Sequence, residues 1–345
     1  MEYNLLPNTK IKISKICLGT MTYGNQNTEN EGHEQMDYAL ENGINFFDTA
    51  ELYPVPAAAK TQGETERIIG TWFKKKRNRD KVILASKIAG PGDYTKHIRE
   101  NMSFSKKHID KAIENSLKRL QTGYIDLYQL HWPERRTNTL GLRGFIYSNT
   151  DPWQENFEEI LDALNHHIKL GNIRHIGLSN ENPWGIMRFL NASKTQRTKM
   201  ITIQNPYSLL NRQFEVGSAE ICHREGIKLL AYSPLGFGML TGKYLNGRKP
   251  KNSRLVLFPN FKRYSSLQSI AATERYSKLA SDHGISITEM SLSFVNDRSF
   301  VCSNIIGATN MEQLKQNIRS HNINLSKSVL SEIEKIHNEI PDPAP

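Results

Sequence analysis

Four side chains able to move protons follow three apolar stretches, each where a strand is expected to end. Asp48 and Tyr53 come after the first stretch, Lys87 closes the second and His131 closes the third. If the three strands are parallel neighbours, their carboxyl ends share one edge and these side chains share one mouth. A carboxylate, a phenol, an ammonium and an imidazole together indicate a proton-transfer site.

The chemistry of each group suggests its role. A tyrosine acts as a general acid near neutral pH only if its pKa of about 10 is lowered, which a nearby ammonium does by stabilising the phenolate. Lys87 would supply the ammonium to Tyr53, and Asp48 would fix Lys87. Neutral His131 would donate a hydrogen bond to a substrate oxygen. The set predicts protonation of an oxygen as it becomes an alkoxide, as in carbonyl reduction, or the reverse reaction.

Taken singly, each of these residues has an ordinary structural explanation. A lone Lys or Asp at a strand end is usually a salt-bridged surface residue, and a lone His there is usually structural. Catalytic residues of eight-stranded α/β barrels come from the carboxyl ends of several strands, so consistent positions favour a shared site.

The elements that would position these residues repeat along the chain as short strand, loop and amphipathic helix. Strands are expected near residues 15–20, 45–50, 81–87, 124–131, 172–179, 200–204, 227–233 and 300–306. Helices are expected near 33–42, 64–76, 108–121, 153–170, 183–192, 213–224, 272–283 and 311–319. Glycines at 43, 123, 171 and 226 predict helix ends. Strands that are apolar on both faces are typical of a buried parallel sheet.

The fold class predicted from this repeat is α/β, a closed (β/α)8 barrel of the TIM type. Typical barrels need about 250 residues, and this chain has 345. The surplus is expected in an N-terminal β-hairpin over 3–13, long loops at the C-terminal face and an extra C-terminal helix over 327–337. No linker divides the chain, which predicts a single domain over residues 1–345.

Bulk properties narrow the class of protein. The net charge of +10 is densest at Lys74–Arg79, which is expected to close a helix and to be solvated there rather than to bind nucleic acid. No apolar stretch is long enough to cross a membrane, and no signal peptide is apparent. Cys17, Cys222 and Cys302 are expected to pack in the core, and their odd, sparse count favours a reducing, cytoplasmic location.

A hydride donor would complete carbonyl reduction, but no GxGxxG motif stands at the start of a βαβ unit. Phosphate sites in barrels are commonly built from the loops after strands 7 and 8. Lys243 and Arg254 lie in the first of these loops, although Arg254 could equally be a solvated loop residue. Ser179, Asn180 and Gln204 suit a carboxamide and Tyr232 suits stacking, although Asn180 could instead cap the next helix.

The chain resembles the aldo-keto reductases over more than nine-tenths of its length. The resemblance rests on Asn42–Ala50, Ala85–Lys87, Leu127–Trp132, Ile176–Asn180, Gln204–Tyr207, Ala231–Gly236 and Gly307–Thr309. Within the family it is most similar to the bacterial Tas-type (tyrosine-auxotrophy suppressor) branch, through Pro54–Pro56 and Gln204–Arg212.

The resemblance implies a reductase that binds NADPH across the barrel mouth and acts on a small-molecule carbonyl substrate. Asp48, Tyr53, Lys87 and His131 match the catalytic tetrad. The cofactor positions matched are Gly19, Thr20, Met21, Ser179, Asn180, Gln204, Tyr232, Ser233, Leu235, Gly236, Lys243, Arg254, Gly307, Thr309, Gln313 and Asn317. Arg254 resembles an arginine that meets the 2′-phosphate.

The sequence departs from the family pattern twice. The segment Pro54–Gln62 separates Tyr53 from Gly63 and is expected to reshape one pocket wall, and no proline precedes Gly307. Two alternatives stay open: an NADPH-binding regulatory or redox-sensing subunit with little turnover, and a metal-dependent barrel hydrolase. The pair His166–His167 is expected mid-helix, away from the mouth, and so does not favour the hydrolase. No ligand cluster at strand ends supports a metal, and the pattern carries no signal for an oligomeric state.

Overall fold

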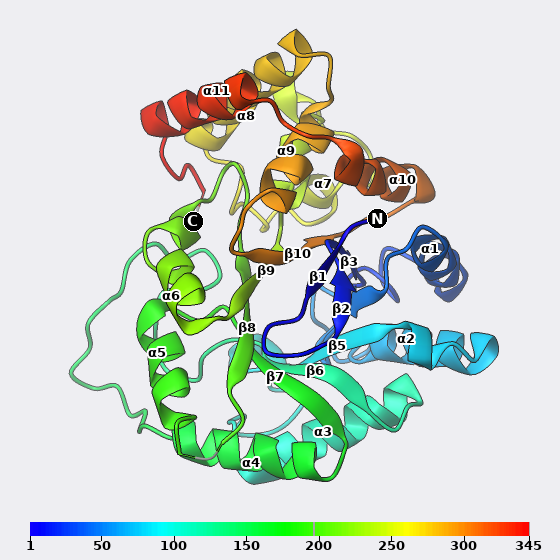
Figure 1. Ribbon diagram of the computed structural model, residues 1–345, viewed down its shortest axis with the longest axis vertical. Helices are drawn as coiled ribbons and strands as arrows, with labels where there is room; N and C mark the ends of the chain where they lie inside the picture. Colours follow the sequence, from blue (N-terminus) through cyan, green and yellow to red (C-terminus); the bar gives the residue numbers. More distant parts are fainter. Residues whose placement is uncertain (196, 345) are drawn as a thin grey trace.

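A closed barrel of parallel strands forms the centre of the computed structural model, which describes residues 1–195 and 197–344 (Figure 1). The strands follow one another in chain order around the barrel. They are β3 (Ile16–Gly19), β4 (Phe46–Asp48), β5 (Ile83–Ile88), β6 (Ile125–Leu130), β7 (Ile173–Ser179), β8 (Met200–Pro206), β9 (Lys228–Tyr232) and β10 (Val301–Ile306). The predicted barrel is confirmed.

An antiparallel hairpin covers the amino end of the barrel. It consists of β1 (Tyr3–Leu5) and β2 (Lys12–Ser14), as predicted, and its Leu6 and Ile13 are fully buried. Both side chains pack into the barrel interior, which is filled by Cys17, Phe46, Ala85, Leu127, Ile201, Leu230, Cys302 and Ile305. Because apolar side chains fill this end, only the carboxyl end remains open to ligands.

Helices surround the strands and bury their apolar faces against them (Figure 1). They are α1 (Glu29–Glu41), α2 (Glu64–Lys76), α3 (Lys106–Leu120), α4 (Phe157–Lys169), α5 (Pro183–Ala192), α6 (Ser218–Glu225), α9 (Ile287–Asn296) and α10 (Met311–Arg319). A capping box between Thr28 and Glu31 starts α1. The helix ends predicted at Gly43, Gly171 and Gly226 are confirmed, but after α3 Gln121 rather than Gly123 takes the left-handed conformation.

The segment between β9 and β10 holds more helix than the sequence indicated. Besides α8 (Leu267–Asp282) it contains α9, which was not predicted, and the short α7 (Arg254–Leu257). Helix α9 packs against β10 and α10, whereas α8 packs against the predicted C-terminal helix α11 (Lys327–Glu339), at the top of Figure 1. The helix predicted over 272–283 corresponds to α8, which is an extra helix outside the regular barrel. The helix that packs on the barrel between β9 and β10 is α9.

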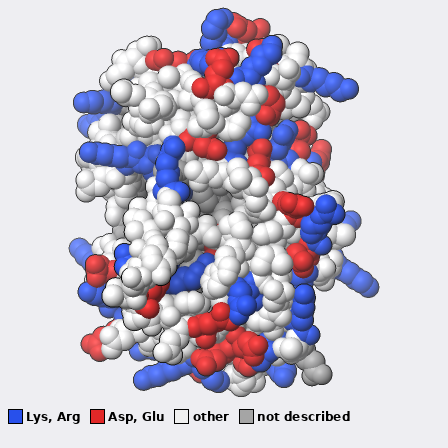
Figure 2. Space-filling view, turned by 90° about the vertical axis from the view of Figure 1, so that its left-hand side faces the viewer, with Lys and Arg blue, Asp and Glu red and all other residues white. Residues whose placement is uncertain are grey.

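Positive and negative side chains are mixed on the face of the molecule that Figure 2 shows. Lys74–Arg77 are exposed at the end of α2, as expected, whereas Arg79 turns inward and donates to Asp126 at 2.7 Å. Figure 2 shows Lys and Arg interspersed with Asp and Glu over one face. All three cysteines are buried and unpaired, which confirms their predicted packing role. Within the described residues, no helix is long and apolar enough to cross a membrane.

Candidate active site

A cavity of about 1390 Å³ opens at the carboxyl end of the barrel. It exceeds the ~300–1,000 Å³ of a typical small-ligand pocket, so it has room for a dinucleotide beside a second molecule. Every predicted catalytic residue except Lys87 lines it, and so does every predicted cofactor residue except Gly236. Lys87 lies fully buried beneath the floor, and Gly236 packs behind the wall against Tyr264.

The floor of the cavity is built on a buried ion pair. Lys87 Nζ donates to Asp48 Oδ2 at 2.6 Å and to the Thr49 carbonyl at 2.8 Å. Burial favours the neutral amine, but the Asp48 carboxylate and the Tyr53 hydroxyl outweigh it, and the pKa of Lys87 is raised. The lysine is therefore an ammonium ion at neutral pH.

Two glutamines hold the other oxygen of the same carboxylate. Gln204 Nε2 donates to Asp48 Oδ1 at 2.8 Å, and Gln129 Nε2 lies 3.5 Å from that oxygen. Gln129 was not among the predicted site residues. It faces the interior because β5 and β6 pair with Lys87 opposite Gln129. The inward alternation of β6 was the signal that could have identified it.

Tyr53 lies above this pair. The Lys87 ammonium is 5.0 Å from the centre of the Tyr53 ring. Burial raises the pKa of the Tyr53 hydroxyl, while the charge of Lys87 and its hydrogen bond oppose that shift. The sequence argument expected a lowered pKa and was wrong in direction, because it counted the ammonium but not the loss of solvent. Tyr53 is a protonated phenol at neutral pH, the form that can donate.

His131 completes the group. Its ring meets the Tyr53 ring edge to face, with centroids 5.7 Å apart. Burial, and then the charge of Lys87, hold the pKa of His131 well below its usual value. The imidazole is therefore neutral at neutral pH, as expected. Its buried Nδ1 has no hydrogen-bond partner within the described residues, so this polar atom is not engaged in holding the fold.

The residues predicted to bind a carboxamide lie beside the tetrad. Tyr232 Oη donates to Asn180 Oδ1 at 2.6 Å, and Asn180 Nδ2 donates to the His131 carbonyl at 2.8 Å. The N-cap of α5 is Asn182, so Asn180 is not the cap. Ser179 Oγ donates to the Gln204 carbonyl at 2.9 Å. These bonds fix the amides of β7 and β8 around one corner of the cavity.

Two cations also line the cavity. Lys243 and Arg254 both line it, and within residues 1–195 and 197–344 neither forms an ion pair with an acidic side chain. Burial, and then the charge of Arg254, lower the pKa of Lys243, and burial also lowers the pKa of Arg254. Arg254 is therefore not the solvated loop residue that the sequence also allowed. Partly buried cations without a counter-ion suit an anionic ligand.

The loop after β10 is fixed by side chains of α10. Asn317 Nδ2 donates to the Gly307 carbonyl at 3.0 Å, and the Thr309 amide donates to Gln313 Oε1 at 3.1 Å. These bonds define the turn although no proline precedes Gly307. The other predicted cofactor positions lie along the adjacent rim, at Gly19, Thr20, Met21, Ser233 and Leu235.

The inserted segment forms part of the cavity wall. The Gly63 amide donates to the Tyr53 carbonyl at 2.9 Å, so the chain leaves and returns at the same point. Val55, Pro56 and Ala57 line the cavity between these points. Trp132 and Tyr94 line the cavity as well, and neither was among the predicted site residues.

The pair His166–His167 lies in α4, away from this site. His167 Nε2 contacts Asp110 Oδ1 at 2.9 Å, between α4 and α3 on the outside of the barrel. Among the residues that the structure describes, no group of three or more His, Cys, Asp or Glu side chains is placed to hold a metal ion.

Comparisons with known proteins agree with this arrangement. The family model described as "Aldo/keto reductase family" matches residues 15–338. "Protein tas" of Escherichia coli (strain K12) is 48% identical over the full length of both chains. "Uncharacterized oxidoreductase YrpG" of Bacillus subtilis (strain 168) is 34% identical, covering 97% of this chain and 96% of its own. "Norsolorinic acid reductase B" of Dothistroma septosporum is 27% identical, covering 97% and 81%.

Proposed function

The chain belongs to the aldo/keto reductase family, and on that premise we propose that it reduces an aldehyde or ketone with NADPH, using Tyr53 as general acid. The family and the relatives support an oxidoreductase role. The proposal adds the coenzyme, the acid and the direction of the reaction. The name of the fungal relative, a reductase, favours that direction.

The observation that carries the proposal is the stacked order of Asp48, Lys87 and Tyr53 at the cavity floor. Asp48 holds the ammonium at 2.6 Å, and the ammonium lies beneath the Tyr53 ring. When the phenol gives up its proton, the developing phenolate faces a fixed positive charge in a site shielded from water, which lowers the barrier.

The residues present fit a phosphorylated dinucleotide. Lys243 and Arg254 offer positive charge to the cavity, and Ser179, Asn180 and Gln204 offer amides and a hydroxyl. NADPH, when bound, supplies the hydride for the carbonyl carbon. Lys243 and Arg254 would hold its phosphates, and the Tyr232 ring would pack against the nicotinamide.

The substrate oxygen would lie between Tyr53 and His131. Neutral His131 donates a hydrogen bond and orients the carbonyl. Tyr53 then transfers its hydroxyl proton to that oxygen, and the resulting phenolate is held by Lys87 until solvent returns a proton. We further propose that the protein works in the cytoplasm, since its three buried thiols are unpaired.

Replacement of Tyr53 by Phe tests the proposal. We expect NADPH binding, measured by quenching of protein fluorescence, to stay at the wild-type dissociation constant, because only the hydroxyl is removed. Turnover of the best aldehyde in a broad panel should fall by about 10²–10⁴-fold, the contribution of general acid catalysis.

Two results would contradict it. Undiminished turnover in Tyr53→Phe would remove Tyr53 as the acid. A wild-type protein that binds NADPH tightly but reduces no carbonyl in the panel would favour the regulatory or redox-sensing alternative.

A further inference from the structure

A second buried ion pair lies next to the tetrad, between Glu51 and Arg99. Arg99 Nη2 donates to Glu51 Oε1 at 2.6 Å, and Arg99 Nη1 donates to Glu51 Oε2 at 2.7 Å. The Arg99 side chain is 3% exposed and the Glu51 side chain 1%. Glu51 stands between Asp48 and Tyr53 in sequence, and neither partner lines the cavity. The tetrad chemistry makes no use of this pair.

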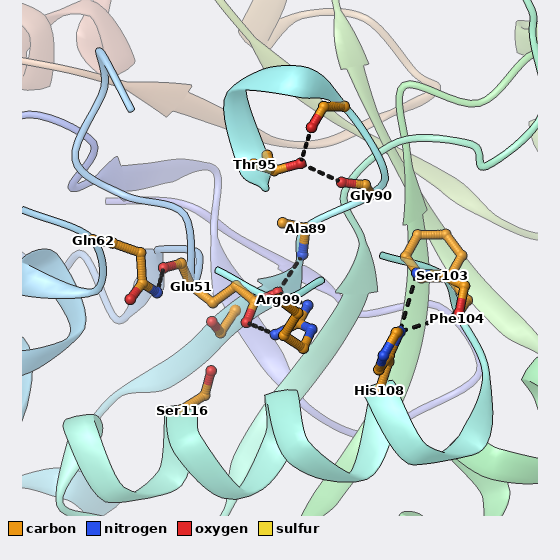
Figure 3. Close-up of polar contacts among 12 residues, drawn as sticks. Glu51, Gln62, Ala89, Gly90, Thr95, Arg99, Ser103, Phe104, His108 and Ser116 are labelled. Carbon is orange, nitrogen blue, oxygen red and sulfur yellow. Dashed lines mark hydrogen bonds and ion pairs between the residues drawn. The ribbon is translucent and has the colours of Figure 1, made fainter. Parts of the chain in front are cut away.

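The Glu51 carboxylate holds both ends of one loop. Besides the two bonds from Arg99, its Oε1 accepts a hydrogen bond from the Ala89 amide at 2.7 Å (Figure 3). Ala89 follows β5 directly and Arg99 lies further along the same loop, so the segment between them is closed at its base by one side chain. We refer to residues 90–98 as the wall loop.

The main chain of Glu51 is fixed as well. Its amide donates to the Lys87 carbonyl at 3.2 Å, and its carbonyl accepts from Gln62 Nε2 at 2.6 Å. The base of the wall loop is thereby tied to the end of β5 and to the inserted segment after Tyr53. These two main-chain bonds restrict movement of the Glu51 carboxylate relative to Tyr53.

The wall loop seats an aromatic surface. Trp132 Nε1 donates to the Pro91 carbonyl at 2.9 Å, and a Cβ at Gly90 would overlap that indole. Tyr94 packs on Trp132 with centroids 5.6 Å apart. Inside the loop, Thr95 Oγ1 donates to the Gly92 carbonyl at 2.9 Å.

The aromatic surface continues to the reacting groups. Trp132 contacts His131 with centroids 4.7 Å apart, and His131 contacts Tyr53. Tyr94, Trp132, His131 and Tyr53 all line the cavity. A flat carbonyl substrate bound at Tyr53 would therefore extend along Trp132 toward Tyr94, whereas a short aliphatic one would not reach them.

We propose that Arg99 and Glu51 are specificity-determining positioning residues, which hold the wall loop so that Tyr94 and Trp132 select ring-bearing aldehydes over short aliphatic ones. This inference rests on the proposed carbonyl reduction. Arg99 acts through Glu51 and the loop, since it touches neither the cavity nor the tetrad.

The charge-conserving variant Arg99→Lys is the direct test. One ammonium cannot span both Glu51 oxygens as the planar guanidinium does, so the loop base should loosen while the buried charge stays paired. We expect kcat/KM for 2-naphthaldehyde to fall by about 10–100-fold, mostly through KM, because loss of contact geometry has costs of that order. Values for propanal and the NADPH dissociation constant should stay at the wild-type level.

A matched control is Arg212→Lys. Arg212 forms a similar two-point contact with Glu215, at 2.8 and 2.7 Å, after β8 on the opposite side of the barrel, and it does not line the cavity. Its variant should keep the wild-type ratio of the two aldehydes. A second variant, Glu51→Gln with Arg99→Leu, removes both charges, so that no ion is left buried alone if Arg99→Lys does not fold.

Equal losses for both aldehydes in Arg99→Lys, or a wild-type ratio in either Arg99 variant, would overturn the inference. A separate readout is calorimetric binding of 2-naphthalenemethanol to the NADP⁺-loaded protein, which the wild type should bind more tightly than Arg99→Lys. If the wild type reduces no carbonyl, the proposed function fails, while this binding comparison still decides the role of Arg99.

Discussion

Two groups of charged residues, one at each end of the barrel, differ in how their charges are paired. At the amino end, Asp126 is fully buried and accepts from Arg79 at 2.7 Å, from Arg174 at 2.7 Å and from the Leu84 amide at 2.9 Å. At the carboxyl end, Lys243 and Arg254 face a cavity without an acidic partner among the described residues. The charges of the first group are paired within the chain, whereas the second group suits an anionic ligand from outside.

This difference separates residues that hold the fold from residues that bind. A buried charge whose partners are all supplied by the chain costs stability when one partner is removed. A cation lacking a counter-ion already carries the cost of burial, so its removal should spare the fold and weaken the ligand instead. We therefore expect the Asp126 cluster to hold the fold and the two cations to bind a ligand, in line with the roles of the two ends in other barrels.

The largest expected effect on stability comes from the amino end. Asp126→Asn leaves Arg79 and Arg174 without their shared carboxylate and should lower the free energy of unfolding by about 3–5 kcal/mol. Denaturant titration measures this change. The kcat of the folded fraction should equal that of the wild type, and a fall in kcat at unchanged stability would break the comparison.

A smaller effect, on binding alone, is expected at the carboxyl end. Arg254→Gln should weaken NADPH binding by about 1.5–3 kcal/mol, the usual contribution of a charge-assisted hydrogen bond. Stability should be unchanged or slightly raised, because an unpaired, partly buried cation is removed. The dissociation constants of NADPH and NADH measure this. Equal weakening of both coenzymes would show that Arg254 does not meet the 2′-phosphate.

The smallest expected effect is the absence of a pH response near neutrality. His131 has a pKa well below 6.5 and is neutral above that pH, and Tyr53 has a pKa above 10 and keeps its proton below that pH. The kcat/KM for the aldehyde, which reports the pKa values of the enzyme before the aldehyde binds, should therefore be flat between about pH 6.5 and 10. An alkaline loss already complete at pH 9 would mean that Lys87, rather than burial, controls Tyr53.

Where the sequence argument failed, the reason was a contact between distant residues. Helix α9 is the exception, because its Ser286 cap, bonded to the Glu289 amide, is a local signal that the sequence argument missed. Gln129 reads as an ordinary strand residue until β5 and β6 are paired. Glu51 and Arg99 are separated by the whole of α2 and β5, so only packing brings them together.

The sequence by itself determined the barrel, the order of its strands and the placing of Asp48, Tyr53, Lys87 and His131 at strand ends. Such features depend on local periodicity and on the common direction of parallel strands, which a one-dimensional pattern contains. Only the tertiary structure decided that burial outweighs the ammonium at Tyr53 and that Glu51 closes the wall loop. It also decided that, among the described residues, Lys243 and Arg254 have no acidic partner. Each of these depends on solvent exclusion and on distances between segments, which exist only once the chain is packed.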